Sequence, residues 1–116
     1  MLFLSAQDFF TQAAAVPRLT REEEKQLAQA MPQDPAARDR LIRGYFPLVA
    51  GYIRRSPKYL RTLQTVYVCL AALEKDVDSF DFLHSNERFS HHLNWRLRQC
   101  ITRCIADRSS YKQALD

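Results

Sequence analysis

The pattern of apolar and polar positions is most regular in residues 89–107, FSHHLNWRLRQCITRCIAD. Apolar side chains recur there at steps of three and four residues, which predicts an amphipathic helix with one face on a core. The apolar face consists of Leu93, Leu97, Cys100, Ile101, Cys104 and Ile105. The opposite face consists of Trp95, Arg98, Gln99, Thr102, Arg103 and Ala106. Guanidinium groups neutralise phosphate, Gln and Thr hydrogen-bond to base edges, and an indole stacks on an unpaired base, so this polar face is a candidate nucleic-acid surface.

Two shorter helices are predicted near the N-terminus. The first covers residues 5–15 and ends before Pro17. The second begins at Thr20, which forms a capping box with Glu23, and it ends before Pro32. The acidic residues of its first turn complement the positive end of the helix dipole.

The third helix is predicted from the N-cap Asp34 to Arg55, with a kink at Pro47, which removes a backbone hydrogen bond. The fourth covers residues 59–77. No stretch alternates with the period of two that a strand requires, so the predicted fold is all-α, a compact bundle of about five helices. We expect one domain over residues 1–116, divided into an N-terminal helix and linker (1–19), core helices (20–108) and a tail (109–116).

The middle of the fourth helix, residues 66–73, has no charged or strongly polar side chain. A helix that is apolar all round requires burial on both sides. Three explanations follow: a neighbouring helix, most simply the first, covers it; a second copy of the chain covers it; or a different partner binds it. Exposure of Tyr67, Val68 and Ala71 favours the last two explanations.

The net charge of +4 lies entirely in residues 88–116, where six Lys and Arg outnumber two acids, while residues 1–87 hold eleven of each sign. This clustering on and around the two-faced helix is typical of an element that faces phosphate. A solvated basic helix end gives the same charge pattern.

The remaining composition excludes several functional classes. Three cysteines and no basic, apolar leader predict a reduced, cytoplasmic protein, and no stretch approaches the ~20 apolar residues of a membrane span. Cys100 and Cys104 fall on the apolar face, and their spacing from His91 and His92 matches no common zinc motif, so we predict no metal site. No catalytic constellation or phosphate-binding loop is present, so neither an enzyme nor a cofactor is expected.

Four segments resemble segments of one known family: PRLTREEEKQLA (17–28), RLIRGYFPLVAGYIRR (40–55), DVDSFD (76–81) and the helix at 89–107. The last three resemble region 2 of housekeeping-type (sigma-70-like) bacterial sigma factors, and the first resembles the segment just before it, region 1.2. The similarity spans residues 8–108. The resemblance implies a helical domain that binds the RNA polymerase core through one helix and promoter DNA, double- and single-stranded, at the minus-ten element through another.

The resemblance also implies individual roles. Gln99 and Thr102 match positions that read the upstream base pair of the minus-ten element, and Trp95 matches the first of two tryptophans that stack at the edge of the melted region. Arg98 and Arg103 match basic positions near the DNA backbone. The DNA-binding residues implied in this way are Arg88, His92, Trp95, Arg96, Arg98, Gln99, Thr102 and Arg103.

The sequence departs from the family pattern in both the DNA-binding positions and the polymerase-binding helix. Arg96 replaces the second tryptophan, and His92 replaces a tyrosine of the melting segment. In the polymerase-binding helix, mostly apolar side chains replace acids and amides. The candidate partner-binding residues are Leu63, Gln64, Tyr67, Val68, Leu70 and Ala71. The leading hypothesis is therefore a sigma-like DNA-binding module for transcription initiation, and the alternative is a degenerate module that dimerises or binds a regulator through residues 59–77.

Overall fold

The structure is a computed structural model that describes the backbone of residues 2–115 and the side chains of residues 2–108. These residues form six α-helices and one short 3-10 helix, and they contain no strand, which confirms the all-α prediction. The elements in chain order are α1 (Ala6–Ala14), α2 (Arg21–Ala30), α3 (Pro35–Arg43), α4 (Phe46–Arg54), η1 (Lys58–Leu60), α5 (Leu63–Ser79) and α6 (Phe89–Leu115).

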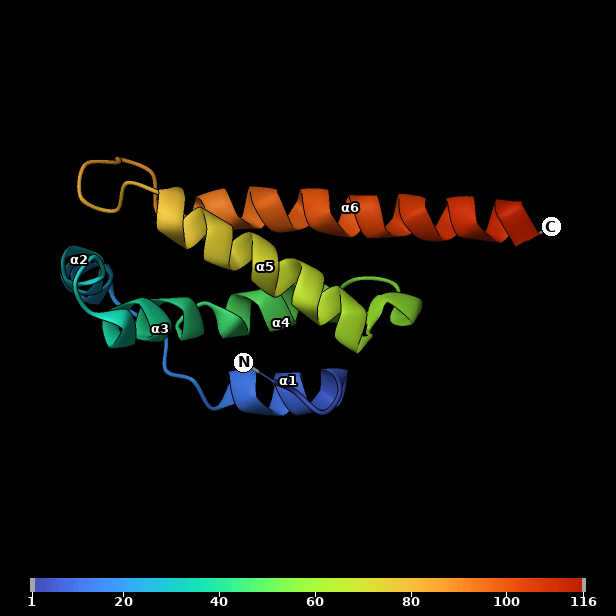
Figure 1. The fold of residues 1–116 in the computed structure, drawn as a ribbon, viewed down its shortest axis with the longest axis horizontal. Helices are drawn as coiled ribbons and strands as arrows, with labels where there is room; N and C mark the ends of the chain where they lie inside the picture. The colour runs from blue at the N-terminus through green and yellow to red at the C-terminus, as the bar shows by residue number, and fades with distance from the viewer. Residues whose placement is uncertain (1, 116) are drawn as a thin grey trace.

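Helix α4 is the centre of the bundle, because it packs against α1 on one side and against α5 and α6 on the other. α5 crosses beneath the long helix α6, and α2 packs on α3 at one end of the molecule (Figure 1). The helical backbone of α6 continues to Leu115, and the side chains of the predicted tail at 109–116 lie outside the described residues.

Local side-chain bonds fix where the helices begin. The capping box at Thr20 and Glu23 is present, with both reciprocal hydrogen bonds, and the Asp34 side chain accepts a hydrogen bond from the Ala36 backbone N–H. Both caps were predictable because each satisfies backbone N–H groups that have no partner within the helix.

The predicted third helix is wrong as a single element, because the chain forms two helices, α3 and α4, separated at Gly44 and Tyr45. Pro47 lies in the first turn of α4. Proline has no N–H to donate to the carbonyl one turn earlier, and its ring crowds that carbonyl, whereas the first turn of a new helix tolerates it. The helix therefore stops and restarts where a kink was expected.

The predicted fourth helix also starts too early. Residues Lys58–Leu60 form the 3-10 turn η1, and α5 begins only at Leu63 and extends to Ser79. The Thr62 side chain accepts a hydrogen bond from the Thr65 N–H, so Thr62 is the N-cap. This threonine was a visible start signal of the kind that identified Thr20.

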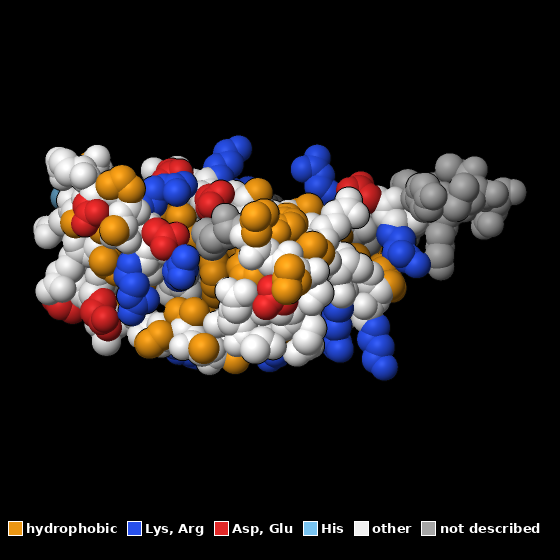
Figure 2. All heavy atoms as spheres, turned by 60° about the horizontal axis from the view of Figure 1, so that its bottom comes forward, with side chains coloured by type: hydrophobic (Ala, Val, Ile, Leu, Met, Phe, Trp, Pro, Cys, Tyr) orange, Lys and Arg blue, Asp and Glu red, His pale blue; other side chains and the backbone are white. Residues whose placement is uncertain are grey.

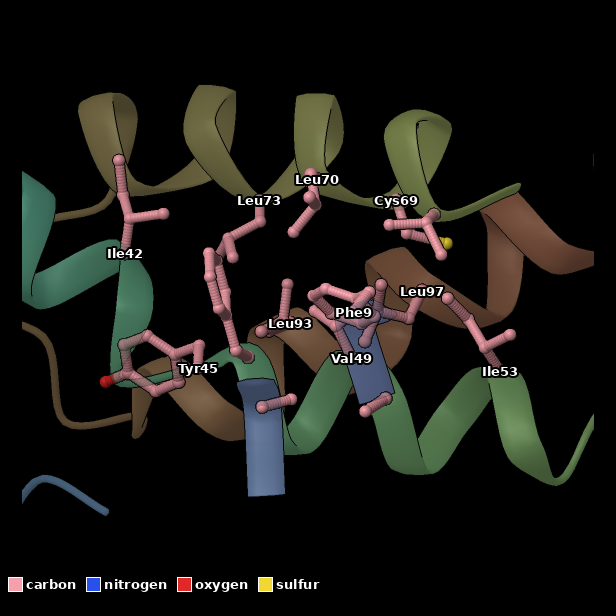
Figure 3. Close-up of a cluster of buried hydrophobic side chains, with 14 of the residues drawn as sticks. Phe9, Ile42, Tyr45, Val49, Ile53, Cys69, Leu70, Leu73, Leu93 and Leu97 are labelled. Atoms are coloured by element: carbon pink, nitrogen blue, oxygen red, sulfur yellow. The ribbon is translucent and has the colours of Figure 1, made fainter. Parts of the chain in front are cut away.

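The core lies between α4, α5 and α6, with α1 closing it from below. Buried side chains from these helices interdigitate around Leu93 and Leu97 of α6, which are 0% exposed (Figure 3). Ile101 is also buried, whereas Cys100, Cys104 and Ile105 are partly buried at the edge of the core. The predicted apolar face of the helix is therefore confirmed, with its C-terminal half less deeply buried than its start.

The two glycines of the chain should respond to alanine substitution with opposite signs. A Cβ added at Gly44 would lie 2.4 Å from Leu19 Cδ1 of the α1–α2 linker, whereas one at Gly51 in α4 would meet its nearest atom, Arg55 Nη1, at 3.9 Å. Gly44→Ala should lower the free energy of unfolding by about 1–3 kcal/mol through overpacking. Gly51→Ala should raise it by about 0.5–1 kcal/mol, because alanine loses less backbone entropy in a helix. Urea denaturation followed by circular dichroism measures both, and equal signs would contradict the close approach at Gly44.

Candidate nucleic-acid interface

One side of α6, along residues 95–103, does not pack against the rest of the described chain. Its side chains are exposed, and Trp95 is 52% exposed, which is unusual for the largest apolar side chain. We call this surface the α6 polar face, and it consists of Trp95, Arg98, Gln99, Thr102 and Arg103. The structure therefore brings these five predicted site residues together on one surface, while their binding to DNA stays a prediction.

The indole of Trp95 has neighbours on its own helix. The His92 ring centroid lies 6.1 Å from the Trp95 ring, and the Arg96 guanidinium carbon lies 5.4 Å from it, within range of a cation–π interaction. The part of the indole left in solvent can stack on an unpaired base.

The start of α6 is anchored by an aromatic cluster. Phe89 lies 4.7 Å from Tyr45 of the α3–α4 corner, measured between ring centroids, and 5.2 and 5.0 Å from Phe80 and Phe82 of the α5–α6 loop. The His92 ring lies 5.5 Å from Phe80, so this side chain extends the cluster toward Trp95. Such packing holds the first two turns of α6 rigidly on the core.

Arg88, just before α6, pairs with α2, which lies at the same end of the molecule (Figure 1). Its Nη2 donates to Glu24 Oε1 of α2 at 3.0 Å, and Glu24 is 5% exposed. Sequence reasoning treated Glu24 as part of the acidic helix start and missed this pair. The available signal was its position one turn before Leu27, on the apolar side of α2, because a carboxylate on such a face requires a partner.

A cavity of about 170 Å³ lies beside this ion pair, between the α1–α2 linker, α4 and the start of α6. The Tyr45 hydroxyl, which borders it, is buried and has no hydrogen-bond partner among the described residues. Burial, and secondarily the nearby Glu24 carboxylate, raise the pKa of Tyr45 well above its usual value. The phenol therefore stays neutral at physiological pH.

Two of the predicted DNA-binding side chains are directed inward. Arg96 Nε donates to Asp76 Oδ2 of α5 at 3.2 Å, and His92 Nε2 lies 3.3 Å from the same oxygen. The Asp76 side chain is 3% exposed. Sequence reasoning assigned Arg96 and His92 to the DNA surface and did not single out Asp76, although this residue lies among the buried positions of α5, one turn after Leu73.

Arg98 and Arg103 differ from Arg88 and Arg96 in their pairing. Neither forms an ion pair within the part of the chain whose side chains are described, whereas Arg88 and Arg96 each contact a buried carboxylate. Their charges are therefore the ones available to an external phosphate.

The predicted partner surface on α5 is divided by the fold. Gln64, Val68 and Ala71 are exposed, with Val68 at 41%, whereas Leu70 is buried in the core at 5%. Leu63 and Tyr67 are partly buried. Leu70 packs inward because it shares a face with the other core positions of α5, so it does not belong to an accessible surface.

Tyr67 is covered by the N-terminal segment. The Phe3 backbone N–H donates to the Tyr67 hydroxyl at 3.0 Å, and the two rings lie 6.4 Å apart. Leu2 and Leu4, on either side of Phe3, are both 92% exposed. Hydrophobic side chains are accordingly visible across the middle of the face that α1 occupies, between charged groups (Figure 2). A neighbouring segment thus explains the apolar character of α5 at Tyr67 but not at Val68 and Ala71.

The cysteines give no indication of a metal centre. Cys100 and Cys104 line an open groove of about 790 Å³ between α5 and α6, and no group of three or more His, Cys, Asp or Glu side chains suited to a metal ion occurs among the described residues. Burial raises the pKa of all three thiols, that of Cys69 to about 12, which makes them poor nucleophiles. No helix in the described part of the chain has the length and hydropathy needed to cross a membrane.

Comparisons with known proteins converge on one group. The chain is 34% identical over 106 residues to the RNA polymerase sigma factor SigA of Clostridium acetobutylicum, an alignment that covers 87% of this chain and 27% of the relative. It is 36% identical over 91 residues to the RNA polymerase principal sigma factor HrdD of Streptomyces coelicolor, covering 78% of this chain and 26% of the relative. HrdD of Streptomyces viridifaciens is 37% identical over the same length.

The chain spans about a quarter of the length of these curated relatives. No family model matches the sequence, and no solved structure matches it either. The secondary-structure elements of its described residues are all helices. The chain is therefore a partial homologue of the primary bacterial sigma factors and belongs to the sigma-70-like family through a fragment that covers region 2.

Proposed function

We propose that this chain is a sigma-like module for transcription initiation, which contacts RNA polymerase and binds the minus-ten element through the α6 polar face. The observation that supports this proposal best is the arrangement of α6: a half-exposed Trp95 beside Arg98 and Arg103, which have no ion-pair partner among the described side chains. Its relatives are named as RNA polymerase sigma factors, so we propose a cytoplasmic, non-enzymatic role.

Each group on this face has a role in the proposal. Gln99 and Thr102 hydrogen-bond to base edges of the upstream base pair, and Trp95 stacks on the first unpaired base. Arg98 and Arg103 hold the phosphate backbone, which sets register without reading sequence.

The proposed test is fluorescence anisotropy of the full chain with labelled oligonucleotides. A single-stranded minus-ten oligonucleotide should bind more tightly than a scrambled strand of equal length, because base-edge contacts add to the sequence-independent phosphate term. A duplex with the same sequence measures the cost of strand separation. Equal affinity for a minus-ten duplex and a scrambled duplex would exclude reading of the upstream base pair by Gln99 and Thr102.

A second candidate function is protein binding through α5. The exposure of Val68 and Ala71 supports it, because apolar side chains remain on the surface where the resemblance implies acids and amides. Gel filtration with light scattering tests whether the chain dimerises, and a monomer at high concentration would exclude dimerisation through α5. Pull-down with core RNA polymerase tests whether α5 binds the polymerase instead. If α5 is the contact surface, Val68→Asp should reduce capture of the polymerase. Lys25→Glu on α2 is the control.

A further inference from the structure

We infer that Asp76 is a positioning residue for the α6 polar face, which acts by holding Arg96 and His92 beside Trp95. This inference rests on the proposed function, because the surface that Asp76 organises is the one proposed to bind DNA. Asp76 itself belongs to α5 and is too deeply buried to touch a ligand.

The position of Asp76 explains how one carboxylate can control two side chains. His92 and Arg96 are four residues apart, so they lie on successive turns of α6 and on the same side of the helix. Asp76 Oδ2 meets Arg96 Nε at 3.2 Å and His92 Nε2 at 3.3 Å. A carboxylate that is 3% exposed requires such partners, because an unpaired buried charge is strongly unfavourable.

The same two side chains are the neighbours of Trp95. The Arg96 guanidinium carbon is 5.4 Å from the indole ring, and the His92 ring is 6.1 Å from it. The His92 ring is in turn 5.5 Å from Phe80, so it cannot move away from the indole without leaving the aromatic cluster. Asp76 thus restricts the positions of both groups that lie beside Trp95.

In this arrangement, Arg96 has a different role from Arg98 and Arg103. Arg96 is held by a buried carboxylate and lies over an aromatic ring, so its guanidinium supports the indole. Arg98 and Arg103 have no such partner in the described part of the chain and remain for phosphate. A stacking side chain fixed before binding loses less conformational entropy when a base arrives, which raises affinity.

Fluorescence tests this inference directly, because Trp95 is the one tryptophan of the chain. Asp76→Asn should shift the emission of Trp95, increase its quenching by acrylamide and weaken single-stranded minus-ten binding about fivefold. The double variant Asp76→Asn/Arg96→Gln should bind no more weakly than Asp76→Asn, since Asp76 acts through Arg96. The matched control is Asp78→Asn, two residues along α5, where the carboxylate is exposed and pairs with Arg38 instead.

If Asp76→Asn does not fold, Arg96→Gln and His92→Gln replace it, because each removes one partner of the Asp76 carboxylate. The Arg96 and His92 side chains are 37% and 28% exposed. Unchanged Trp95 emission in these folded variants overturns the inference. Changed emission with unchanged affinity in a chain that binds DNA also overturns it. Changed emission in a chain whose wild type binds no minus-ten strand supports the positioning role and refutes the proposed function.

Discussion

Removing both guanidinium groups of the α6 polar face, in Arg98→Ala/Arg103→Ala, is expected to weaken binding to a single-stranded minus-ten oligonucleotide about tenfold to hundredfold at low salt. These two side chains are exposed and have no ion-pair partner among the described residues, so their removal leaves no buried acid uncompensated. The loss therefore reports contacts with the nucleic acid rather than a change in stability. Anisotropy titration gives the affinity, and urea denaturation of the same variant should match the wild type.

The salt dependence of binding supplies an independent measure. Each phosphate neutralised on a single strand contributes about 0.7 to the slope of log affinity against log salt, so the double variant should lose about 1.4 of that slope. The matched control is Arg18→Ala/Arg21→Ala, which removes two guanidinium groups that are exposed on the α1–α2 linker and at the start of α2. If both double variants weaken binding equally, net charge rather than the α6 polar face explains the affinity, and our assignment of this surface fails.

Replacing Phe9 with alanine is expected to lower the free energy of unfolding by about 3–5 kcal/mol. Phe9 is 0% exposed, and its ring lies 5.4 Å from Phe46 of α4 and 5.1 Å from Phe3, measured between centroids. Its loss removes the side chain that joins α1 to the central helix and leaves a cavity there. A change of this size is a large part of the ~5–15 kcal/mol stability of a typical domain.

Leu4→Ala is the control for this prediction, because Leu4 lies in the same segment and is 92% exposed. It should change the free energy of unfolding by no more than about 0.5 kcal/mol. Urea denaturation followed by circular dichroism measures total helix, and Trp95 emission follows α6 separately. Should Phe9→Ala cost less than about 1 kcal/mol, α1 does not share the cooperative core with α4, α5 and α6.

Short-range signals predicted much of the helical framework. Thr20 and Asp34 mark true helix starts, because a cap satisfies backbone groups within three residues and requires no tertiary contact. The burial of Leu93, Leu97 and Ile101 was predicted from the helical periodicity of α6, which is also a local property of the sequence. The prediction was wrong at Pro47, where a kink was expected and the helix instead ends and a new one begins. A proline that breaks a helix and a proline that kinks it give the same sequence pattern, so the pattern alone could not distinguish them.

The candidate site was predictable in composition but not in organisation. The sequence by itself determined that Trp95, Arg98, Gln99, Thr102 and Arg103 share one polar face, because helical periodicity places them there whatever α6 packs against.

Only the tertiary structure decided which charged groups on and around that face are already paired. Arg88 meets Glu24 from 64 positions away, and Arg96 meets Asp76 from 20 positions away. Such contacts depend on how whole helices pack, which no pattern of three or four residues encodes. The sequence therefore determined the polar face of the helix, whereas the ion pairs with Glu24 of α2 and Asp76 of α5 determined which of the charges near it remain available.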